Sequence, residues 1–392
     1  MADKRLRVVH IAKYYPPDPG GMEFVVRDLA REQARRGHEV LVLAHARQMP
    51  PGQTKDESGV KVKRFKVWAT VGGYAPMAPE LMRAIRQLGC DFKPDLIHLH
   101  CPNPAGVALW PLPCPLPLVL HWHADVVFPA DRSPAGWQLT LWRKLERGLL
   151  KRAARIITTS PHYAPTSNVL ADYLDKVRVV PLGLPSSSAA DSAPVAGDAT
   201  AWFRSRPAGR RLLAIGRLSH YKGYSFLLEA LAGLAQVSLC LIGQGEEKEL
   251  LEAQCARLGL NDRVLIAGQV SEDERESCLK LADLFCLPSL DRSEAFGLVL
   301  LEAMRAGKAC LATRVPGSGM SHALGGGQAG VLVEPGDVEQ LRMAIARLLA
   351  DDHERKRLAE AGQARFLSYF TLPVIEARVE EIYEEILARY PL

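Results

Sequence analysis

The sequence predicts an α/β protein with two halves, each built around a doubly wound parallel sheet. Short β-rich apolar runs alternate with helical segments, the pattern of a parallel sheet with helices on both faces. This alternation stops at residues 184–209, which are rich in Ala, Ser, Pro and Gly, and starts again after them. The length of 392 residues is enough for two domains of ordinary size.

The first half, residues 1–183, begins with a β-rich run, a loop rich in Pro and Gly, and a helix over residues 22–36. Apolar residues recur at helical spacing in that helix, and Gly37 is a natural residue to end it. Strands are expected at residues 7–12, 39–44, 61–67, 95–100, 118–123, 155–159 and 177–181, and further helices near residues 79–88 and 137–154.

After the predicted linker 184–209, the second half spans residues 210–370. Its strands are expected at residues 212–215, 237–242, 263–267, 284–287, 309–313 and 331–333. Ser271 and Glu274 form a capping box that starts one of the helices between them. The tail 351–392 is predicted as two helices that break near residues 371–373. The last helix, 371–392, is expected either to pack back on the first half or to stay on its own domain.

Composition excludes several classes of protein. Hydrophobic residues make up 48% and charged residues 24%, which is ordinary globular usage. The net charge of +5 is too dilute for a nucleic-acid binder. The eight cysteines show no C-x-x-C spacing, and the N-terminus resembles no signal peptide, so a cytoplasmic location is expected. No apolar run approaches the ~20 residues of a membrane span.

Ligands of open α/β sheets bind beyond the carboxyl ends of the strands, so the loops that follow the strands are the candidate sites. Gly20 and Gly21 lie in such a loop, where paired glycines let the backbone approach a ligand and the helix N-terminus attracts an anion. A tight turn without a ligand is the alternative.

Two cations, Arg217 and Lys222, lie on the loop after the strand 212–215. They suit a diphosphate, because Arg offers a planar fork of donors and Lys a point charge. The alternative, of equal weight, is that both are solvated surface charges.

Two carboxylates come after the strand 284–287. Glu294 precedes a helix and Glu302 lies within it, and the opening stretch 298–301 of this helix is wholly apolar. Such a helix is expected to be buried, and a carboxylate on it needs a donor, for which sugar hydroxyls are suitable. An internal ion pair is the alternative for Glu302.

His121 and His123 share one face of a strand, which would place two metal ligands side by side. No clear third ligand follows in the sequence, and a zinc site needs three or four, so no metal is predicted. His98 and His100 repeat the pattern and are interpreted as a strand-end pair with satisfied hydrogen bonds.

The segment LIGQGEEK, residues 241–248, begins like a dinucleotide fingerprint. Lys248 stands where the third glycine is needed, and Glu246 and Glu247 would repel a pyrophosphate. A dinucleotide-dependent oxidoreductase is therefore disfavoured.

Seven segments resemble the large retaining glycosyltransferase family 4. In the family's order they are PGGMEFVVRDLARE, HWHADVV, VVPLG, AIGRLSHYKG, LIGQGEEKELLE, FCLPSLDRSEAFGLVLLEAMRAGK and GVLVEPGD. The spacing of Glu294 and Glu302, with the Gly-Arg-Leu and Lys-Gly residues of loop 216–223, is the most specific feature. The resemblance implies the GT-B fold of two facing Rossmann-like domains with a C-terminal helix crossing back.

The resemblance also implies a role for each candidate residue. Arg217 and Lys222 would hold the diphosphate of a nucleotide-sugar donor, and Glu302 would bind the ribose. The catalytic candidates are Glu294, which would accept hydrogen bonds from the transferred sugar, and His123 beside it. The remaining donor-binding residues are Gly20, Gly21, Phe296, Gly297, Leu298 and Val299, the last three through their N–H groups. The cations would stabilise the leaving diphosphate, so no metal or cofactor is expected.

The leading hypothesis is a sugar transferase of polysaccharide or lipopolysaccharide assembly that works with retention. The segments HWHADVV and RSEAFG resemble mannosyl and rhamnosyl members, which favours a donor like GDP-mannose and a saccharide or lipid-linked acceptor. A non-catalytic nucleotide-sugar binder is the alternative. The loop 316–319 aligns too poorly for any donor contact to be assigned. In residues 61–68, basic residues alternate with apolar ones, which suits peripheral contact with the inner membrane or a solvated strand face.

Overall fold

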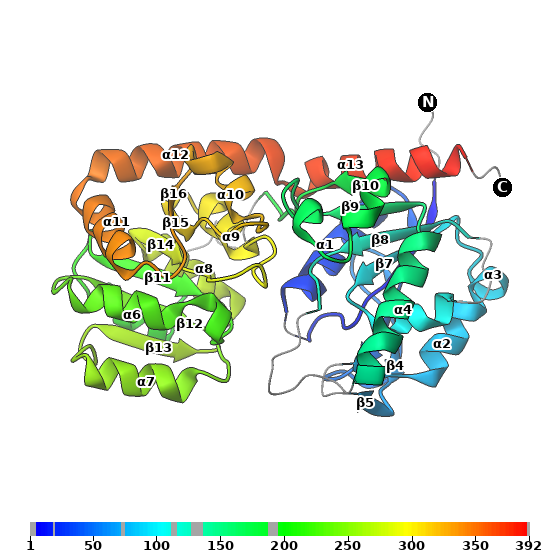
Figure 1. The fold of residues 1–392 in the computed structure, drawn as a ribbon, viewed down its shortest axis with the longest axis horizontal. Helices are drawn as coiled ribbons and strands as arrows, with labels where there is room; N and C mark the ends of the chain where they lie inside the picture. The colour runs from blue at the N-terminus through cyan, green and yellow to red at the C-terminus, as the bar shows by residue number, and fades with distance from the viewer. Residues whose placement is uncertain are drawn as a thin grey trace. The chain divides into compact units, whose positions relative to one another are not determined.

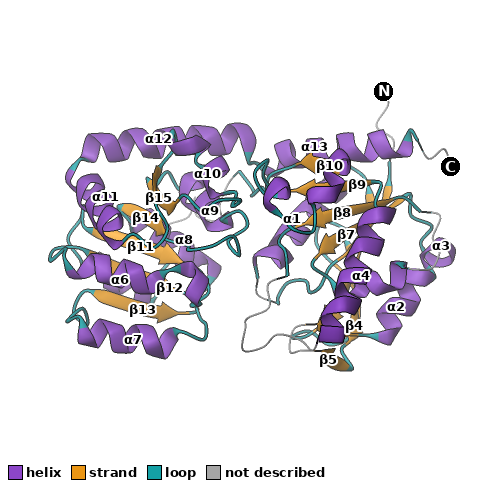
Figure 2. Ribbon diagram, in the orientation of Figure 1, coloured by secondary structure: helices purple, strands orange, loops and turns teal. Residues whose placement is uncertain are grey.

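The computed structural model describes residues 5–18, 20–71, 75–110, 116–126, 136–186 and 195–389, with backbone alone for 136–139. Contacts divide the chain into unit 1, Met1–Leu182 with Leu372–Leu392, and unit 2, Gly183–Thr371. In each unit, helices flank a central sheet (Figures 1 and 2). Pro19 and Val127 of the family segments, and residues 187–194 of the predicted linker, lie outside the described residues.

In the sheet of unit 1, later strands are added on both sides of the first strand. Its order is β10 (Val177–Val179), β9 (Arg155–Thr158), β8 (Leu118–Trp122), β7 (Leu96–Cys101), β1 (Arg7–Ile11), β2 (Glu39–Ala46), β4 (Lys61–Lys66) and β3 (Gly52–Lys55). All neighbours are parallel except β3 and β4. The chain therefore winds outward in two directions from β1 and β7, and their carboxyl ends form a topological switch point.

The helices of unit 1 include one from the far end of the chain. They are α1 (Gly21–Arg35), α2 (Pro79–Arg86), α3 (Leu88–Asp91), α4 (Gly136–Arg152) and α13 (Leu372–Leu387). Strands β5 (Ala69–Val71) and β6 (Ala75–Met77) pair antiparallel in a small separate sheet. Helix α13 packs beside α1, and Val379 and Tyr383 share a core cluster with Leu29 and Leu96. The last helix of the tail thus lies on the first half of the chain.

Unit 2 has a fully parallel sheet with the same kind of reversal. Its order is β13 (Val264–Gly268), β12 (Ser238–Ile242), β11 (Arg211–Ile215), β14 (Leu284–Leu287), β15 (Cys310–Thr313) and β16 (Val331–Val333). Its helices are α5 (Asp198–Arg204), α6 (Tyr224–Ala232), α7 (Lys248–Arg257), α8 (Glu272–Leu281), α9 (Leu298–Arg305), α10 (Met320–Ala323), α11 (Val338–Ala350) and α12 (Asp352–Tyr369). The switch point lies between β11 and β14.

The second part of the predicted linker is folded. Helix α5 lies within it, and its Phe203 is fully buried. The carboxylate of Glu274 accepts a hydrogen bond from the N–H of Ala199, 2.9 Å away, at the start of α5. Ser271 caps α8 as predicted, but Glu274 uses its side chain to cap this other helix. Composition alone missed the helix because its stabilising partner is 75 residues away.

Two of the basic side chains in the segment 61–68, which suggested membrane contact, are engaged in bonds within the protein. Lys61 pairs with Glu39 at 2.8 Å, and buried Arg64 donates to the carbonyl of Pro16 at 2.7 Å. Peripheral membrane contact stays a prediction. In the described part of the chain, no helix is long and apolar enough to cross a membrane.

The packing of α13 makes the stability of unit 1 depend on pH. Glu376 is fully buried, and its Oε2 lies 2.6 Å from Nη1 of Arg36. Burial raises the pKa of Glu376 to about 7, although Arg36 opposes the shift. Between the unfolded value of about 4.3 and the folded value, the folded state holds a proton that the unfolded chain releases. Stability should therefore fall as the pH rises through this range.

We expect Glu376→Gln to flatten this dependence in urea unfolding measured at pH 5 and pH 8. Glu380→Gln is the matched control, because Glu380 also pairs with Arg36 but is partly exposed. The assignment is wrong if wild type and Glu376→Gln lose equal stability between the two pH values.

Candidate active site

The loops that follow β11 and β14 meet at the switch point of unit 2. The N–H of Leu290 donates to the carbonyl of Tyr221 at 2.7 Å. Gly223 has a φ of +69°, and a Cβ there would lie 2.1 Å from the carbonyl oxygen of Pro288. Glycine is therefore required where the two loops touch, and this contact brings the predicted cation loop to the predicted carboxylate loop.

Lys222 and Glu294 form a buried ion pair. Nζ of Lys222 contacts Oε2 of Glu294, and the hydroxyl of Ser289 donates to the same oxygen at 3.2 Å. The two side chains are 8% and 11% exposed. Burial alone would lower the pKa of Lys222, but Glu294, followed by Tyr224 and Tyr221, raises it above the ordinary value. The sequence assigned these residues to different parts of a ligand, and in this structure they also contact each other.

Arg217, on the same loop, is exposed. Its Nη2 lies 3.2 Å from Oε2 of Glu246. An exposed pair of this kind contributes only about 0–1 kcal/mol, so Glu246 holds Arg217 weakly. Glu246, which was expected to repel a pyrophosphate, here holds the guanidinium beside the loop.

The glycines of the segment 241–248 are needed for close packing between two loops. A Cβ at Gly243 would lie 1.8 Å from the carbonyl oxygen of Gly216, and one at Gly245 would lie 2.1 Å from that of Leu218. These glycines let the loop after β12 lie directly against the loop after β11. Close packing of the backbone thus accounts for the fingerprint-like beginning of the segment.

The N-terminus of α9 is open to an anion. Gly297 caps it with a φ of +82°, a conformation that glycine adopts without strain. The carbonyls of Glu294 and Ala295, four residues before Leu298 and Val299, accept instead from the Ser318 hydroxyl and the Gly319 N–H. Among the backbone hydrogen bonds of the described residues, none involves the N–H of Leu298 or Val299, whereas that of Leu300 donates to the carbonyl of Gly297 at 2.8 Å. Free N–H groups at a helix start are suited to bind a phosphate.

Phe296 and the loop 316–319 both have structural contacts beside this site. The ring of Phe296 is 2% exposed and lies 6.1 Å from that of Phe370, so its side chain packs in the core of unit 2. Loop 316–319, left unassigned from the sequence, supports the Glu294 loop through Ser318 and Gly319. Gly317 has a φ of +78°, a backbone conformation that is common for glycine in Pro-Gly turns.

Glu302 lies in α9 and is 5% exposed. Its Oε2 has no hydrogen-bond partner among the residues that the structure describes, and the nearest cation, Nε of Arg275, lies 3.5 Å away. Burial raises the pKa of Glu302, and Arg275 only partly offsets this. The internal ion pair that was the alternative for Glu302 is thus present with Arg275, but at 3.5 Å it is long. A hydroxyl donor would satisfy the oxygen that the protein leaves unpaired.

In unit 1, the glycine loop after β1 leads into α1. Gly20 precedes the helix with a φ of +154°, and a Cβ there would lie 2.1 Å from Oε2 of Glu23. The carboxylate of Glu23 thus folds back over the start of α1, and its pKa is raised, first by burial. The position where an anion was predicted is next to a carboxylate of the helix itself.

His123 directly follows β8 and is 8% exposed. Its backbone N–H donates to the carbonyl of Cys101 at 3.0 Å, and its Nε2 lies 3.0 Å from Nδ1 of His100. Burial lowers the pKa of His123 to about 3, so the ring is neutral near pH 7.

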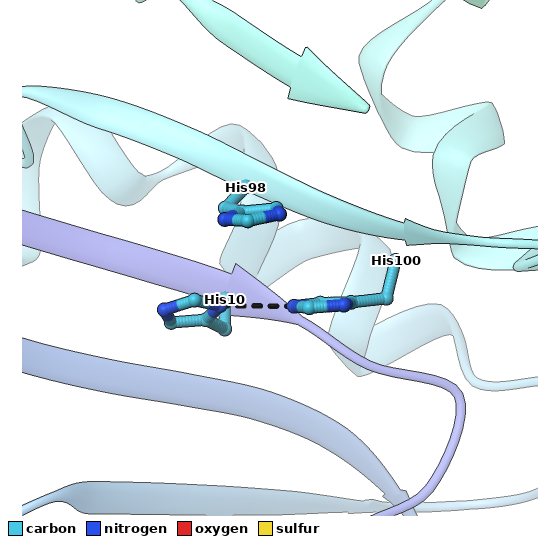
Figure 3. A group of neighbouring side chains, drawn as sticks. All are labelled: His10, His98 and His100. Carbon is cyan, nitrogen blue, oxygen red and sulfur yellow. Dashed lines mark hydrogen bonds between the residues drawn. The ribbon is translucent and has the colours of Figure 1, made fainter. Parts of the chain in front are cut away.

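The sequence analysis found no third histidine beside His121 and His123, but the structure brings histidines of neighbouring strands next to them. His10 pairs in register with His98, and His100 with His121. The histidines form two clusters, and in each cluster three ring nitrogens lie close together. One cluster is His10, His98 and His100 (Figure 3), and the other is His100, His121 and His123. The signal was present in the repeated His-x-His, but it required knowing that β1, β7 and β8 are adjacent.

Comparison with known families covers both units. Residues 20–184 match the family described as glycosyl transferase 4-like domain, and residues 203–365 match glycosyl transferases group 1. The chain belongs to the GT-B glycosyltransferases of the family 4 type. The resemblance inferred from its motifs is confirmed, and the protein is an enzyme of the glycosyltransferase class.

Curated relatives match over nearly the whole length. The D-rhamnosyltransferase WbpZ of Pseudomonas aeruginosa is 28% identical over 93% of this chain and 92% of its own. The O-antigen chain mannosyltransferase C of Escherichia coli is 26% identical over 93% of this chain and 95% of its own.

Solved structures confirm the predicted fold class. Sucrose-phosphate synthase from Thermosynechococcus elongatus superposes with a TM-score of 0.79 at 23% identity, over 98% of this chain and 100% of its own. The Anabaena protein HepE in complex with UDP and glucose gives a TM-score of 0.71 at 22% identity, over 97% and 100% of the two chains.

Proposed function

We propose that this glycosyltransferase moves a hexose, with retention of configuration, from a nucleoside-diphosphate sugar to a saccharide or lipid-linked saccharide. The observation that carries the proposal is the switch point of unit 2. There Lys222, Arg217 and the start of α9 offer positive charge to a diphosphate, beside a buried carboxylate of Glu302 that lacks a donor. The names of the relatives favour a mannosyl or rhamnosyl donor, such as GDP-mannose, and a role in bacterial surface polysaccharide.

The proposed step breaks the bond between the anomeric carbon and the diphosphate oxygen. Positive charge then develops on the sugar and negative charge on the diphosphate. Arg217, Lys222 and the N–H groups of Leu298 and Val299 stabilise the negative group, because they are in place before the charge develops. The leaving oxygen accepts the proton of the acceptor hydroxyl, and the new glycosidic bond forms on the face from which the diphosphate departs.

The two carboxylates take different parts of the donor. Glu302 accepts hydrogen bonds from the ribose hydroxyls, which satisfies its unpaired oxygen. Glu294 accepts from hydroxyls of the transferred sugar while it stays paired with Lys222, so that one ion pair connects recognition of the sugar with stabilisation of its leaving group. His123, neutral and held by its neighbours in unit 1, is the proposed catalytic histidine.

A screen of GDP-, UDP-, ADP- and dTDP-sugars by thermal shift and by hydrolysis tests the function, with NAD as the control ligand. We expect one base to raise Tm, and its mannose or rhamnose form to be hydrolysed slowly in the absence of an acceptor. A Tm shift without turnover, even with an acceptor, supports the non-catalytic alternative. A response to NAD alone overturns the proposal.

A further inference from the structure

Five buried histidines of unit 1 form two parallel rows across β1, β7 and β8. Histidines two residues apart on one strand stack face to face: His98 on His100 with 4.5 Å between ring centroids and 7° between planes, and His121 on His123 with 4.3 Å and 8°. His10 continues one row on the neighbouring strand. Each row therefore runs across the sheet, and stacking along the strands joins the two rows.

The first row consists of Gln33, His10, His100 and His123. Oε1 of Gln33 lies 2.7 Å from Nε2 of His10, Nδ1 of His10 lies 2.9 Å from Nε2 of His100, and Nδ1 of His100 lies 3.0 Å from Nε2 of His123. The successive ring centroids are 5.2 and 5.3 Å apart, with planes 26° and 21° from parallel. These rings meet edge to edge, as Figure 3 shows for His10 and His100, with His98 in a separate parallel layer.

The positions of the protons along this row follow from its first member. Burial makes all three imidazoles neutral, so each carries one N–H and one bare nitrogen. The carbonyl oxygen of Gln33 only accepts, so Nε2 of His10 carries the proton and its Nδ1 is bare. Nε2 of His100 must then donate to His10, and Nε2 of His123 must donate to His100. The row therefore ends in a bare Nδ1 on His123.

In the orientation that the structure gives it, the amide of Gln33 also joins the second row. Its Nε2 donates to the hydroxyl of Tyr383 at 3.3 Å, and that hydroxyl is hydrogen-bonded to Nδ1 of His98. Nε2 of His98 in turn lies 3.3 Å from Nδ1 of His121. An amide turned by 180° would exchange its donor and acceptor ends and reverse the order of protons in both rows. Helices α1 and α13, which carry Gln33 and Tyr383, thus control the tautomers of histidines on the sheet.

The ring geometry favours protons over a metal as the links between histidines. A metal needs three or four lone pairs that converge on one point about 2.0–2.1 Å away. In-plane lone pairs of stacked rings run parallel and do not converge. Within a row, each junction joins only two nitrogens, at distances typical of hydrogen bonds.

We propose that Gln33, His10 and His100 are positioning residues that hold His123 with its proton on Nε2 and its Nδ1 bare. The bare nitrogen is the hydrogen-bond acceptor that His123 offers to a substrate hydroxyl. The role of His123 rests on the proposed function, but the tautomer does not.

Nuclear magnetic resonance of the full chain with ¹⁵N-labelled histidine tests the proposal without reference to activity. We expect His123 to carry its proton on Nε2, with coupling across the hydrogen bond to a bare Nδ1 of His100. A proton on Nδ1 of His123, or of His100, overturns the proposal. So does stoichiometric zinc in the purified protein, or the loss of these N–H signals when zinc is added.

Gln33→Met removes the acceptor at the start of the row with little change of volume. We expect the fixed order of protons at His100 and His123 to be replaced by a mixture of tautomers. The value of kcat should fall about 10- to 100-fold, as it does when partners that orient functional histidines are removed, while KM for the donor changes little. An unchanged tautomer and rate would contradict the proposal.

The matched control is His98→Phe, which keeps an aromatic ring against His100 and removes hydrogen bonds of the second row, while Gln33 keeps its contact with the hydroxyl of Tyr383. It should leave the proton of His123 on Nε2, and a scrambled tautomer at His123 would count against the proposed row. If the tautomer is as expected but no nucleotide sugar is bound or turned over, the proposed function fails and the positioning chain stands.

Discussion

Lys222→Ala should lower the single-turnover rate of sugar transfer by about 10²–10³-fold, the usual effect of removing one preorganised group that stabilises developing charge. Affinity for the intact donor should fall much less, because the charge on the diphosphate grows only in the transition state. The substitution also leaves Glu294 buried without its cation. Breaking a buried pair on one side costs about 3–5 kcal/mol, so unit 2 should also lose stability.

Two further variants separate rate from stability. Lys222→Ala combined with Glu294→Gln removes the uncompensated charge and should recover most of the lost stability, but none of the rate. Arg217→Ala should lower the rate without destabilising the protein, because Arg217 is exposed and only weakly paired. Urea unfolding and single-turnover kinetics on the same samples provide the comparison. Full activity in Lys222→Ala would refute the role of the lysine.

Glu302→Gln should weaken binding of the nucleoside diphosphate by about 10- to 100-fold, since a hydrogen bond to a charged group contributes about 1.5–3 kcal/mol. The free protein should lose little stability, because burial already disfavours the charged form of Glu302, and its Oε2 has no hydrogen-bond partner in the described structure and only a 3.5 Å ion pair with Arg275. Calorimetric titration with the nucleoside diphosphate measures the effect.

The ligand supplies the control for this prediction. A nucleotide without the 2′- or the 3′-hydroxyl should bind wild type more weakly than the ribonucleotide does. Glu302→Gln should bind both forms equally, because the partner of the hydroxyl is gone. If the variant still discriminates between them as wild type does, Glu302 does not contact the ribose.

Much of the fold was predictable from the sequence because parallel strands buried on both faces appear as short apolar runs. The loops that carry Lys222 and Glu294 could be chosen in advance, since ligand sites of such sheets follow the strands. Their ion pair could not be predicted, because nothing local indicates that β11 and β14 are neighbours. Helix α5 was missed for a related reason, since Glu274, which caps it, comes from a distant helix.

The histidines show the same limit more clearly. The two-residue spacing of His98 and His100, and of His121 and His123, correctly placed each pair on one face of a strand. Strand order then decides that the pairs lie side by side, that His10 joins them, and that the amide of Gln33 ends the row. The direction of the hydrogen bonds in such a cluster depends on how α1 and α13 pack on the sheet. It therefore cannot be predicted from any single stretch of the sequence.

The most direct test of the site in unit 2 compares calorimetric affinities for a nucleoside diphosphate and the matching monophosphate. We expect the diphosphate to bind at least about 100-fold more tightly, a difference of roughly 2.7 kcal/mol, because Arg217, Lys222 and the start of α9 contact the second phosphate. We also expect Arg217→Ala to narrow this gap. Equal affinities for the two nucleotides in wild type would contradict the assignment of the diphosphate to these residues.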